Sequence, residues 1–154
     1  MTGNSYLLHV SVPGPPRGQG SLTLWRAPDG SERAKHPPHT VAHRNLMVGL
    51  LQQAWGLQGP WLGPVVLDST FYMPRPQSHF RTGKYAGEIK PTAPAYPVTF
   101  GRNDADKMIR LVGDALTIAG VIKDDAQIVR VLAVKQWEPG AGNGHTTVIL
   151  EKED

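Results

Sequence analysis

Apolar and polar residues are arranged along the chain in seven periodic segments. Two of these segments repeat apolar residues at helical spacing, which predicts helices over 41–55 and 106–119, each ended by a following glycine. The other five alternate or form short apolar runs, as strands do. These strands are predicted at 6–12, 21–27, 65–73, 126–137 and 145–152. The order β-β-α-β-α-β-β predicts an α+β fold, a single small domain whose two helices pack on one mixed sheet.

Proline and glycine mark the connections between these segments. Residues 28–39 are expected to form a turn and a loop, after which Thr40 is expected to cap the first helix. The connection over 74–100 is the longest and contains five prolines together with several basic residues. Loops of that length in compact domains usually carry function or move, so 74–100 is a candidate binding segment.

Length and composition limit the classes of protein to consider. The chain has 154 residues, which suits a single domain over 1–154, and it has no cysteine. Disulfides, thiolate zinc sites and cysteine nucleophiles are thereby excluded, and a cytoplasmic location is expected. No apolar run approaches the ~20 residues that cross a bilayer, and the first residues lack the features of a secretion signal. We therefore expect no membrane association.

Charge is distributed unevenly along the chain. Residues 1–103 carry ten Lys and Arg against four Asp and Glu, whereas residues 104–125 carry three against five. The acidic segment 104–125 is called the acidic focus below. A basic chain around such a segment is typical of a protein that attracts a polyanion and performs metal chemistry on it. Ordinary solvated charge is the alternative explanation of the same counts.

The acidic focus begins with Asp104 and Asp106, which are two residues apart. In an extended segment entering a helix, this spacing places both carboxylates on one side, where they offer hard oxygen ligands to magnesium or manganese. The alternative is helix capping, because acids near a helix N-terminus interact favourably with the helix dipole. One acid is enough for capping, so the pair favours metal binding.

A second acidic group follows the predicted helix. Asp124 and Asp125 are adjacent, and a bound cation would offset the repulsion between them. On the helix itself, one stripe alternates carboxylates with cations, for which ordinary ion pairs along the helix surface are the alternative explanation. The stripe consists of Asp106, Lys107, Arg110, Asp114 and Thr117.

The segment DADKMIRLVGDALTIAGVIKDDAQIVRVLAVK, residues 104–135, resembles the RusA-type Holliday junction resolvases, which are endodeoxyribonucleases of phages and prophages. That family's pattern is D-x-D, a Lys or Arg four residues after the second Asp, D-A-L, and D-D-x-Q-V before a strand ending in Lys. Weaker similarity extends from residue 6 to about residue 136. The resemblance implies a magnesium-dependent homodimer that nicks four-way DNA junctions symmetrically, in DNA recombination and repair, without a nucleotide cofactor. It also implies a bacterial or phage-infected host cell.

The resemblance assigns roles to the acidic residues position by position. It implies that Asp104, Asp106 and Asp125 hold the catalytic magnesium, with manganese as an alternative ion, and that Asp124 supports them as a further acid. The family usually has proline before its first Asp, where this chain has Asn103. That departure loosens the turn without removing a ligand.

The family's essential basic residue falls on Arg110, where lysine is the better-known occupant. Arginine keeps the charge but does not lose its proton, so it suits clamping of a phosphate and not donation of a proton. Lys107, next to the second Asp, is expected to share this work. Both residues are therefore assigned to catalysis.

The spacing between the two acidic groups raises a geometric question. Thirteen helical steps from 106 to 119 rise about 20 Å, and Asp125 follows only six residues later, a reach of at most ~20 Å. Two arrangements are open. Either the helix is shorter than predicted, or Asp124 and Asp125 meet the D-x-D pair of the other subunit, and we favour the shared site.

Basic residues outside the acidic focus are candidates for DNA contacts. Within 74–90 they are interleaved with aromatic residues, which is typical of a segment that binds a nucleic-acid strand, although a solvated loop has the same composition. The candidates are Arg17, Arg75, His79, Arg81, Lys84 and Lys123.

Functions of other classes remain open. The main alternative is a non-catalytic DNA-binding module of phage or prophage origin, whose acids only cap and pair. It predicts that magnesium is not needed and that Asp125→Asn changes nothing. Two weaker alternatives lack supporting residues. The trio His36, His39 and His43 has no fourth zinc ligand in reach, and a D-x-D sugar transferase normally needs a larger nucleotide-binding domain.

Overall fold

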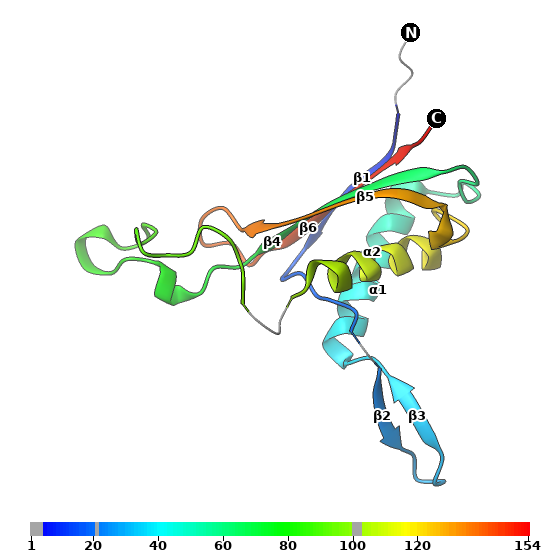
Figure 1. The fold of residues 1–154 in the computed structure, drawn as a ribbon, viewed down its shortest axis with the longest axis horizontal. Coiled ribbons are helices and arrows are strands. Elements are labelled where there is room, and N and C mark those ends of the chain that lie inside the picture. Colours follow the sequence, from blue (N-terminus) through cyan, green and yellow to red (C-terminus); the bar gives the residue numbers. More distant parts are fainter. Residues whose placement is uncertain (1–4, 21, 100–102) are drawn as a thin grey trace.

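The computed structural model describes residues 5–20, 22–99 and 103–154. These residues form two α-helices, six strands and three short 3-10 helices, arranged as two helices against a mixed sheet (Figure 1). The predicted α+β class is confirmed. The elements are β1 (Tyr6–Pro13), β2 (Thr23–Arg26), β3 (Glu32–Lys35), α1 (Pro38–Trp55), β4 (Val65–Met73), η1 (Gln77–His79), η2 (Gly83–Tyr85), α2 (Ala105–Ile118), η3 (Asp125–Gln127), β5 (Ile128–Trp137) and β6 (His145–Lys152).

The main sheet has the strand order β1-β6-β4-β5. β4 and β5 are parallel, and the other neighbours are antiparallel. Every second residue of β4 from Val65 to Met73 is buried, because that face lies under the helices while the opposite face is only half covered. Both helices lie on one side of the sheet (Figure 1). The domain therefore has two layers with the core between them.

Helix α2 is held by its apolar face. Five of its side chains have no measurable exposure, and each Leu→Ala change there would cost about 2–5 kcal/mol. Gly120, with φ of 76°, ends the segment in a left-handed conformation that glycine adopts without strain. The buried residues are Met108, Leu111, Val112, Ala115 and Leu116. This burial fixes where the polar stripe of α2 points.

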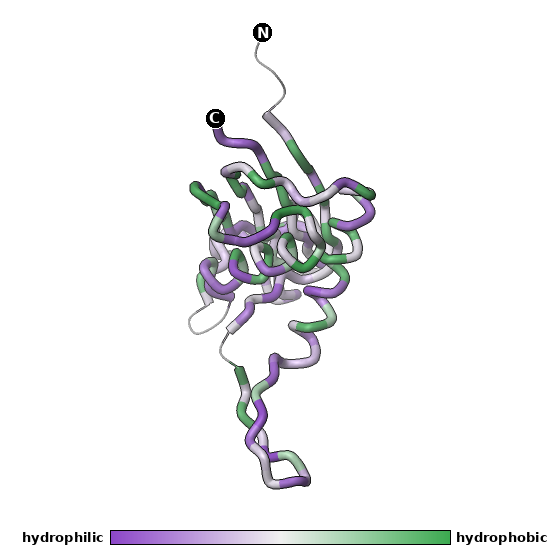
Figure 2. The backbone as a smooth tube through the Cα atoms, turned by 90° about the vertical axis from the view of Figure 1, so that its right-hand side faces the viewer, coloured by the Kyte–Doolittle hydropathy of each residue, from purple (hydrophilic) through white to green (hydrophobic). Residues whose placement is uncertain are grey.

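Two predictions about the N-terminal third are wrong. Residues 28–39 contain strand β3, which pairs with β2 in a hairpin separate from the main sheet. Every residue of both strands is exposed, so no buried face imposes an alternating pattern on β3. Helix α1 begins at Pro38, with Pro37 and not Thr40 at its N-cap, because proline suits the first helical position. The hairpin projects from the body of the molecule in both views (Figures 1 and 2).

Strand β5 lies at the edge of the main sheet, with β4 as its one neighbour. Three of its apolar side chains, Val129, Val131 and Leu132, are about half exposed. An uncovered edge strand with apolar side chains offers a template on which another chain can pair. In the part of the chain that the structure describes, neither helix is long and apolar enough to cross a membrane.

Candidate active site

The first acidic group lies where α2 begins. Asp104 occupies the N-cap position, but its carboxylate makes no capping hydrogen bond, so such a bond does not account for it. Instead, Asp104 Oδ2 lies 3.0 Å from Lys107 Nζ. Asp106 is exposed in the first turn. Two carboxylates and one ammonium group are thus available at this end of the helix.

Asn103, which precedes Asp104, has an unusual backbone conformation. Asn103 has a φ of 56° and is the one non-glycine residue among those described that has a positive φ. Proline, whose φ is fixed near −65°, does not adopt this conformation, whereas asparagine does so more readily than most residues. Lys135 Nζ, near the end of β5, donates a hydrogen bond of 3.1 Å to the Asn103 carbonyl. The end of β5 is therefore tied to the start of α2.

The second acidic group is held by a hydrogen-bond network around Gln127. Asp124 caps η3, because its carboxylate accepts a hydrogen bond of 2.8 Å from the Ala126 amide. Gln127 Oε1 accepts from the amides of Lys123 and Asp124, at 2.8 and 3.0 Å. Its Nε2 donates to two carbonyls in the connector before β4, those of Trp61 at 2.8 Å and Gly63 at 2.9 Å. The D-D-x-Q motif thus fixes its own loop.

Asp125 lies against the middle of α2. A Cβ atom added at Gly113 would be 3.9 Å from the Asp125 Cβ, an ordinary van der Waals distance, so Asp125 lies beside the helix at the level of Gly113. Although Asp125 is exposed, desolvation raises the pKa of its carboxyl, and the Asp124 side chain and the charge of Asp114 raise it further. Asp114, Asp124 and Asp125 line one open hollow of about 340 Å³. Three carboxylates therefore gather at this half of the helix.

Arg110 belongs with the second group. Arg110 and Asp125 both line a groove of about 220 Å³ between α2 and β5. The other lining residues are mainly apolar and include Ile109 and Val131. A guanidinium and a carboxylate thus flank an apolar depression beside the sheet edge.

The two acidic groups do not meet within one chain. Gly113, which marks the level of Asp125, lies seven residues along α2 from Asp106, a rise of about 10 Å. Among the residues that the structure describes, no three His, Cys, Asp or Glu side chains converge on one potential metal position. This includes the histidines of the 36–43 segment. The described residues therefore form two separate acidic groups, one with Lys107 and one with Arg110, which are called half-sites below.

The candidate DNA contacts of the 74–100 loop are partly engaged with one another. The Arg75 guanidinium carbon lies 5.1 Å from the centre of the Trp137 ring, and the His79 ring meets the same indole edge-on. Arg81 lies over the Tyr85 ring and 3.4 Å from Glu88, and Lys84 approaches the same Tyr85 ring. The described part of the loop is therefore folded on itself and fixed to the end of β5.

The two remaining candidates lie nearer the acidic groups. Arg17 is exposed in the turn after β1, and its charge, together with the burial of His43, lowers the pKa of that histidine. Lys123 is exposed immediately before Asp124. Among the residues that the structure describes, neither side chain forms an ion pair, so both charges can meet an anionic ligand beside the half-sites.

Two residues that contact or support the acidic groups cannot be predicted from the sequence. Gln19 is buried and its Nε2 donates a hydrogen bond to Asp114 Oδ2, while its backbone amide binds the Lys107 carbonyl at 2.9 Å. No sequence pattern predicts this contact, because Gln19 lies in a proline- and glycine-rich turn. Gln127 belongs to the D-D-x-Q-V pattern, which assigns it no role, and its four hydrogen bonds cannot be predicted from the sequence.

Comparison with known proteins supplies an independent finding. The model of the family described as Endodeoxyribonuclease RusA matches residues 13–150, which include both acidic half-sites and the groove between α2 and β5. No curated protein matches the chain significantly.

Proposed function

Because the chain belongs to the RusA endodeoxyribonuclease family, we propose that it nicks four-way DNA junctions symmetrically by magnesium-dependent hydrolysis of phosphodiester bonds. The proposed setting is DNA recombination and repair in the cytoplasm of a bacterial or phage-infected cell. The observation that supports the proposal most is the presence of two acidic half-sites along α2, each with its own basic residue.

The donor groups fit a hard divalent cation. The Asp104 carboxylate is not used for capping, and Asp125 is crowded by neighbouring carboxylates whose repulsion a cation offsets. Asp104, Asp106 and Asp125 would hold the ion, and Asp124 would support Asp125 by fixing its loop. When bound, magnesium, or manganese in its place, activates a water molecule and stabilises charge on the scissile phosphate.

The basic residues bind the phosphate. Arginine is a permanent cation, so Arg110 is suited to neutralise charge on the phosphate and not to donate a proton. Lys107, which pairs with Asp104, supplies a second cation at the other half-site. A non-catalytic DNA-binding module would need neither residue beside a crowded carboxylate.

We propose that a homodimer joins the half-sites. The free edge of β5 and its exposed apolar residues are suited to a second copy of this chain, because pairing covers both. A two-fold axis makes such contacts reciprocal, so the beginning of one β5 lies beside the end of the other. Asp125 precedes the beginning of β5, and Lys135 near its end is tied to Asn103. Antiparallel pairing of the two edges therefore brings Asp125 of one copy toward Asp104 of the other.

The enzyme assay compares a synthetic four-way junction with linear duplex, each with and without magnesium. We expect paired nicks in the junction with magnesium and none without it. Absence of cleavage by folded protein would refute the proposed activity. Equal cleavage of both substrates would leave a nuclease without selectivity for junctions.

The shared site is tested by co-expressing two differently tagged variants, Asp104→Asn and Asp125→Asn. A shared arrangement leaves one intact centre in the heterodimer, so nicking of one strand returns, whereas two separate sites leave both centres defective. The matched control pairs Asp104→Asn with Asp106→Asn, which lie in the same half-site and restore nothing in either arrangement. Restoration in the control pair, or none in the test pair, would contradict the shared site.

A further inference from the structure

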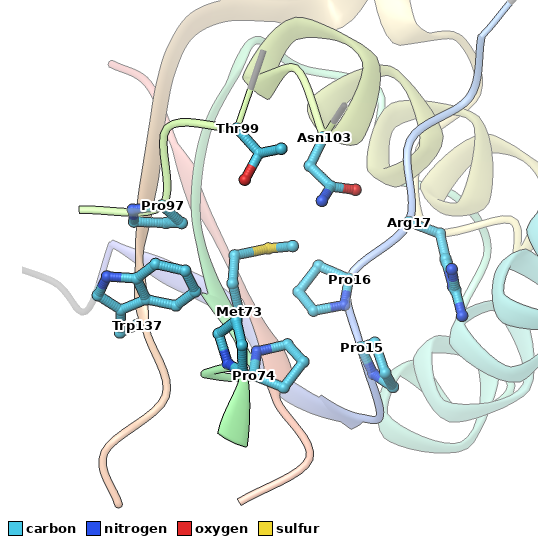
Figure 3. Close-up of a pocket in the computed structure, with 10 residues that line it drawn as sticks. Pro15, Pro16, Arg17, Met73, Pro74, Pro97, Thr99, Asn103 and Trp137 are labelled. Carbon is cyan, nitrogen blue, oxygen red and sulfur yellow. The ribbon is translucent and has the colours of Figure 1, made fainter. Parts of the chain in front are cut away.

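A cavity of about 270 Å³ opens immediately before α2, beside the first acidic half-site. Four separate segments line it: the turn after β1, the end of β4, the segment around Thr99, and the end of β5 (Figure 3). Asn103, adjacent to Asp104, completes the wall. The cavity is therefore lined by the residue that immediately precedes Asp104.

Seven of the ten residues that line the cavity are apolar. Met73 is 6% exposed, and the rings of Pro16 and Pro97 are buried on opposite sides of it (Figure 3). The Trp137 indole lines the same side as Pro97. A concave apolar site with few polar groups is the usual form of a site for a small planar ligand. Its volume lies just below the ~300–1,000 Å³ typical of whole ligands, so it suits a single ring system.

The aromatic wall is held rigidly. Trp137 Nε1 donates a hydrogen bond of 2.9 Å to the Pro94 carbonyl. The Arg75 guanidinium covers the ring at 5.1 Å, and the His79 ring contacts it edge-on at the same distance. Because these contacts fix the indole before any ligand arrives, little side-chain entropy is lost when a ring enters. The contacts of Arg75 and His79 with Trp137 thus fix a wall of the cavity as well as the loop.

The polar groups of the cavity are few and unpaired. Within the described residues, the Asn103 amide and the Thr99 hydroxyl make no hydrogen bond, and both lie across the cavity from Met73 (Figure 3). Asn103 is held at a φ of 56°, a conformation that costs about 1–3 kcal/mol and that concentrates at functional sites. An amide offers a donor and an acceptor together, which matches the edge of a nucleobase.

We propose that this cavity binds one unstacked nucleobase next to the scissile phosphate, with Asn103 reading the base edge. Apolar walls accept the faces of the base, as aromatic and apolar side chains do in single-strand recognition. Arg17, on the outer side of Pro16, is positioned for the adjoining backbone phosphate (Figure 3). Extruding a base costs less at a branch point, where the regular stack is interrupted, than within intact duplex. The cavity thus favours branched over linear DNA.

This inference rests on the proposed function, in which the phosphate is cut at Asp104 and Asp106. The first measurement maps the nicked position with unaltered protein. Nicking rates are then compared on four junctions that differ only in the base beside that position. We expect a preference that the variant Asn103→Gly reduces by roughly tenfold, because one good pair of base contacts contributes about that much discrimination. Glycine adopts the positive φ freely, so the variant removes the amide and leaves the backbone in place.

The second measurement uses binding and not cleavage. Asp106→Asn protein, which does not cut, is titrated with a junction that carries an abasic site at the mapped position. We expect roughly tenfold weaker binding than for the intact junction, as for the loss of one stacked base. Adding Thr99→Trp, which fills the cavity, should abolish that difference. The matched control is Thr92→Trp, an exposed residue of the same loop that does not line the cavity.

The outcomes separate the two proposals. If unaltered protein fails to cut any junction, the proposed activity is refuted. If it cuts, but Asn103→Gly leaves the base preference unchanged and the abasic site leaves binding unchanged, the base cavity is refuted alone. Equal effects of Thr99→Trp and Thr92→Trp would also refute it.

Discussion

Replacing Gln127 with alanine tests whether the D-D-x-Q motif is a positioning device. The side chain makes four hydrogen bonds, two accepted from the amides before η3 and two donated to the connector before β4. No part of this side chain lines the hollow or the groove that hold Asp125. The change therefore removes the support of Asp125 without removing a group that would touch metal or DNA.

The expected loss of stability follows from the number of hydrogen bonds that the change removes. Each hydrogen bond contributes about 0.5–1.5 kcal/mol net, and water replaces some of them in this half-exposed position. We expect Gln127→Ala to lower the free energy of unfolding by about 2–4 kcal/mol. For a chain of this size that corresponds to a fall in Tm of roughly 5–15 °C. Gln127→Glu keeps an oxygen that can accept both hydrogen bonds but loses both N–H donors and places a charge beside two carbonyls, so at least half of the loss is expected.

The assay is urea unfolding followed by nicking of a four-way junction at a temperature where both proteins are folded. Gln53→Ala, on the exposed face of α1, is the matched control and should change stability by no more than about 0.5 kcal/mol. Unchanged stability in Gln127→Ala would refute the positioning role. Unchanged stability with lost nicking would assign Gln127 to direct contact with DNA or metal.

Three further predictions concern charge and assembly. Asp125→Asn should raise the Tm of metal-free protein at neutral pH while it abolishes nicking, because the raised pKa of this carboxyl means that its charged form disfavours the folded state above the ordinary value of 3.8. His43 contributes in the opposite sense: burial first, and the Arg17 charge second, lower its pKa below 6.5. The neutral form of His43 therefore favours the folded state fully above pH 6.5, and this stability is lost as the pH falls below that value. The free energies of unfolding at about pH 7.5 and pH 5.5 should consequently differ less for His43→Gln than for unaltered protein. Leu132→Lys, at an exposed position of β5, should leave monomer stability unchanged and shift the protein from dimer to monomer in sedimentation experiments, and an unchanged dimer would contradict pairing through this edge.

The parts of the fold that the sequence predicts well are those with one buried face. Helix α2 and strand β4 repeat apolar residues with the period of their own geometry, because the same layer boundary buries them along their whole length. Strand β3 has no such boundary. Its residues Glu32, Arg33 and Lys35 are exposed, and a hairpin that packs on nothing leaves no periodic trace. The N-cap of a helix depends on only a few neighbouring residues, and Pro37 and Thr40 are both plausible N-caps of α1 from the sequence alone.

The candidate site, like the fold, could be predicted from the sequence only in part. The acids and their spacing can be read from the sequence, but their meeting points depend on contacts between distant segments. Asp125 is placed by Gln127, which binds the connector more than sixty residues earlier in the chain. The cavity beside Asn103 is formed by four segments, and its Trp137 and Met73 look like ordinary strand residues in the sequence. Only the tertiary structure separates such residues from the rest of the core.

The separation of the half-sites has a consequence for how cleavage is controlled. If α2 and β5 hold the two halves apart in one chain, a single subunit that meets DNA has no complete centre. Pairing of two subunits then creates two centres at once, related by a two-fold axis, as symmetric nicking of a junction requires. A base cavity beside each centre adds a second condition, because it is filled only where a base can leave the stack. On this argument, selectivity for branched DNA arises from assembly and from the unstacked base together, and the acidic residues contribute the chemistry alone.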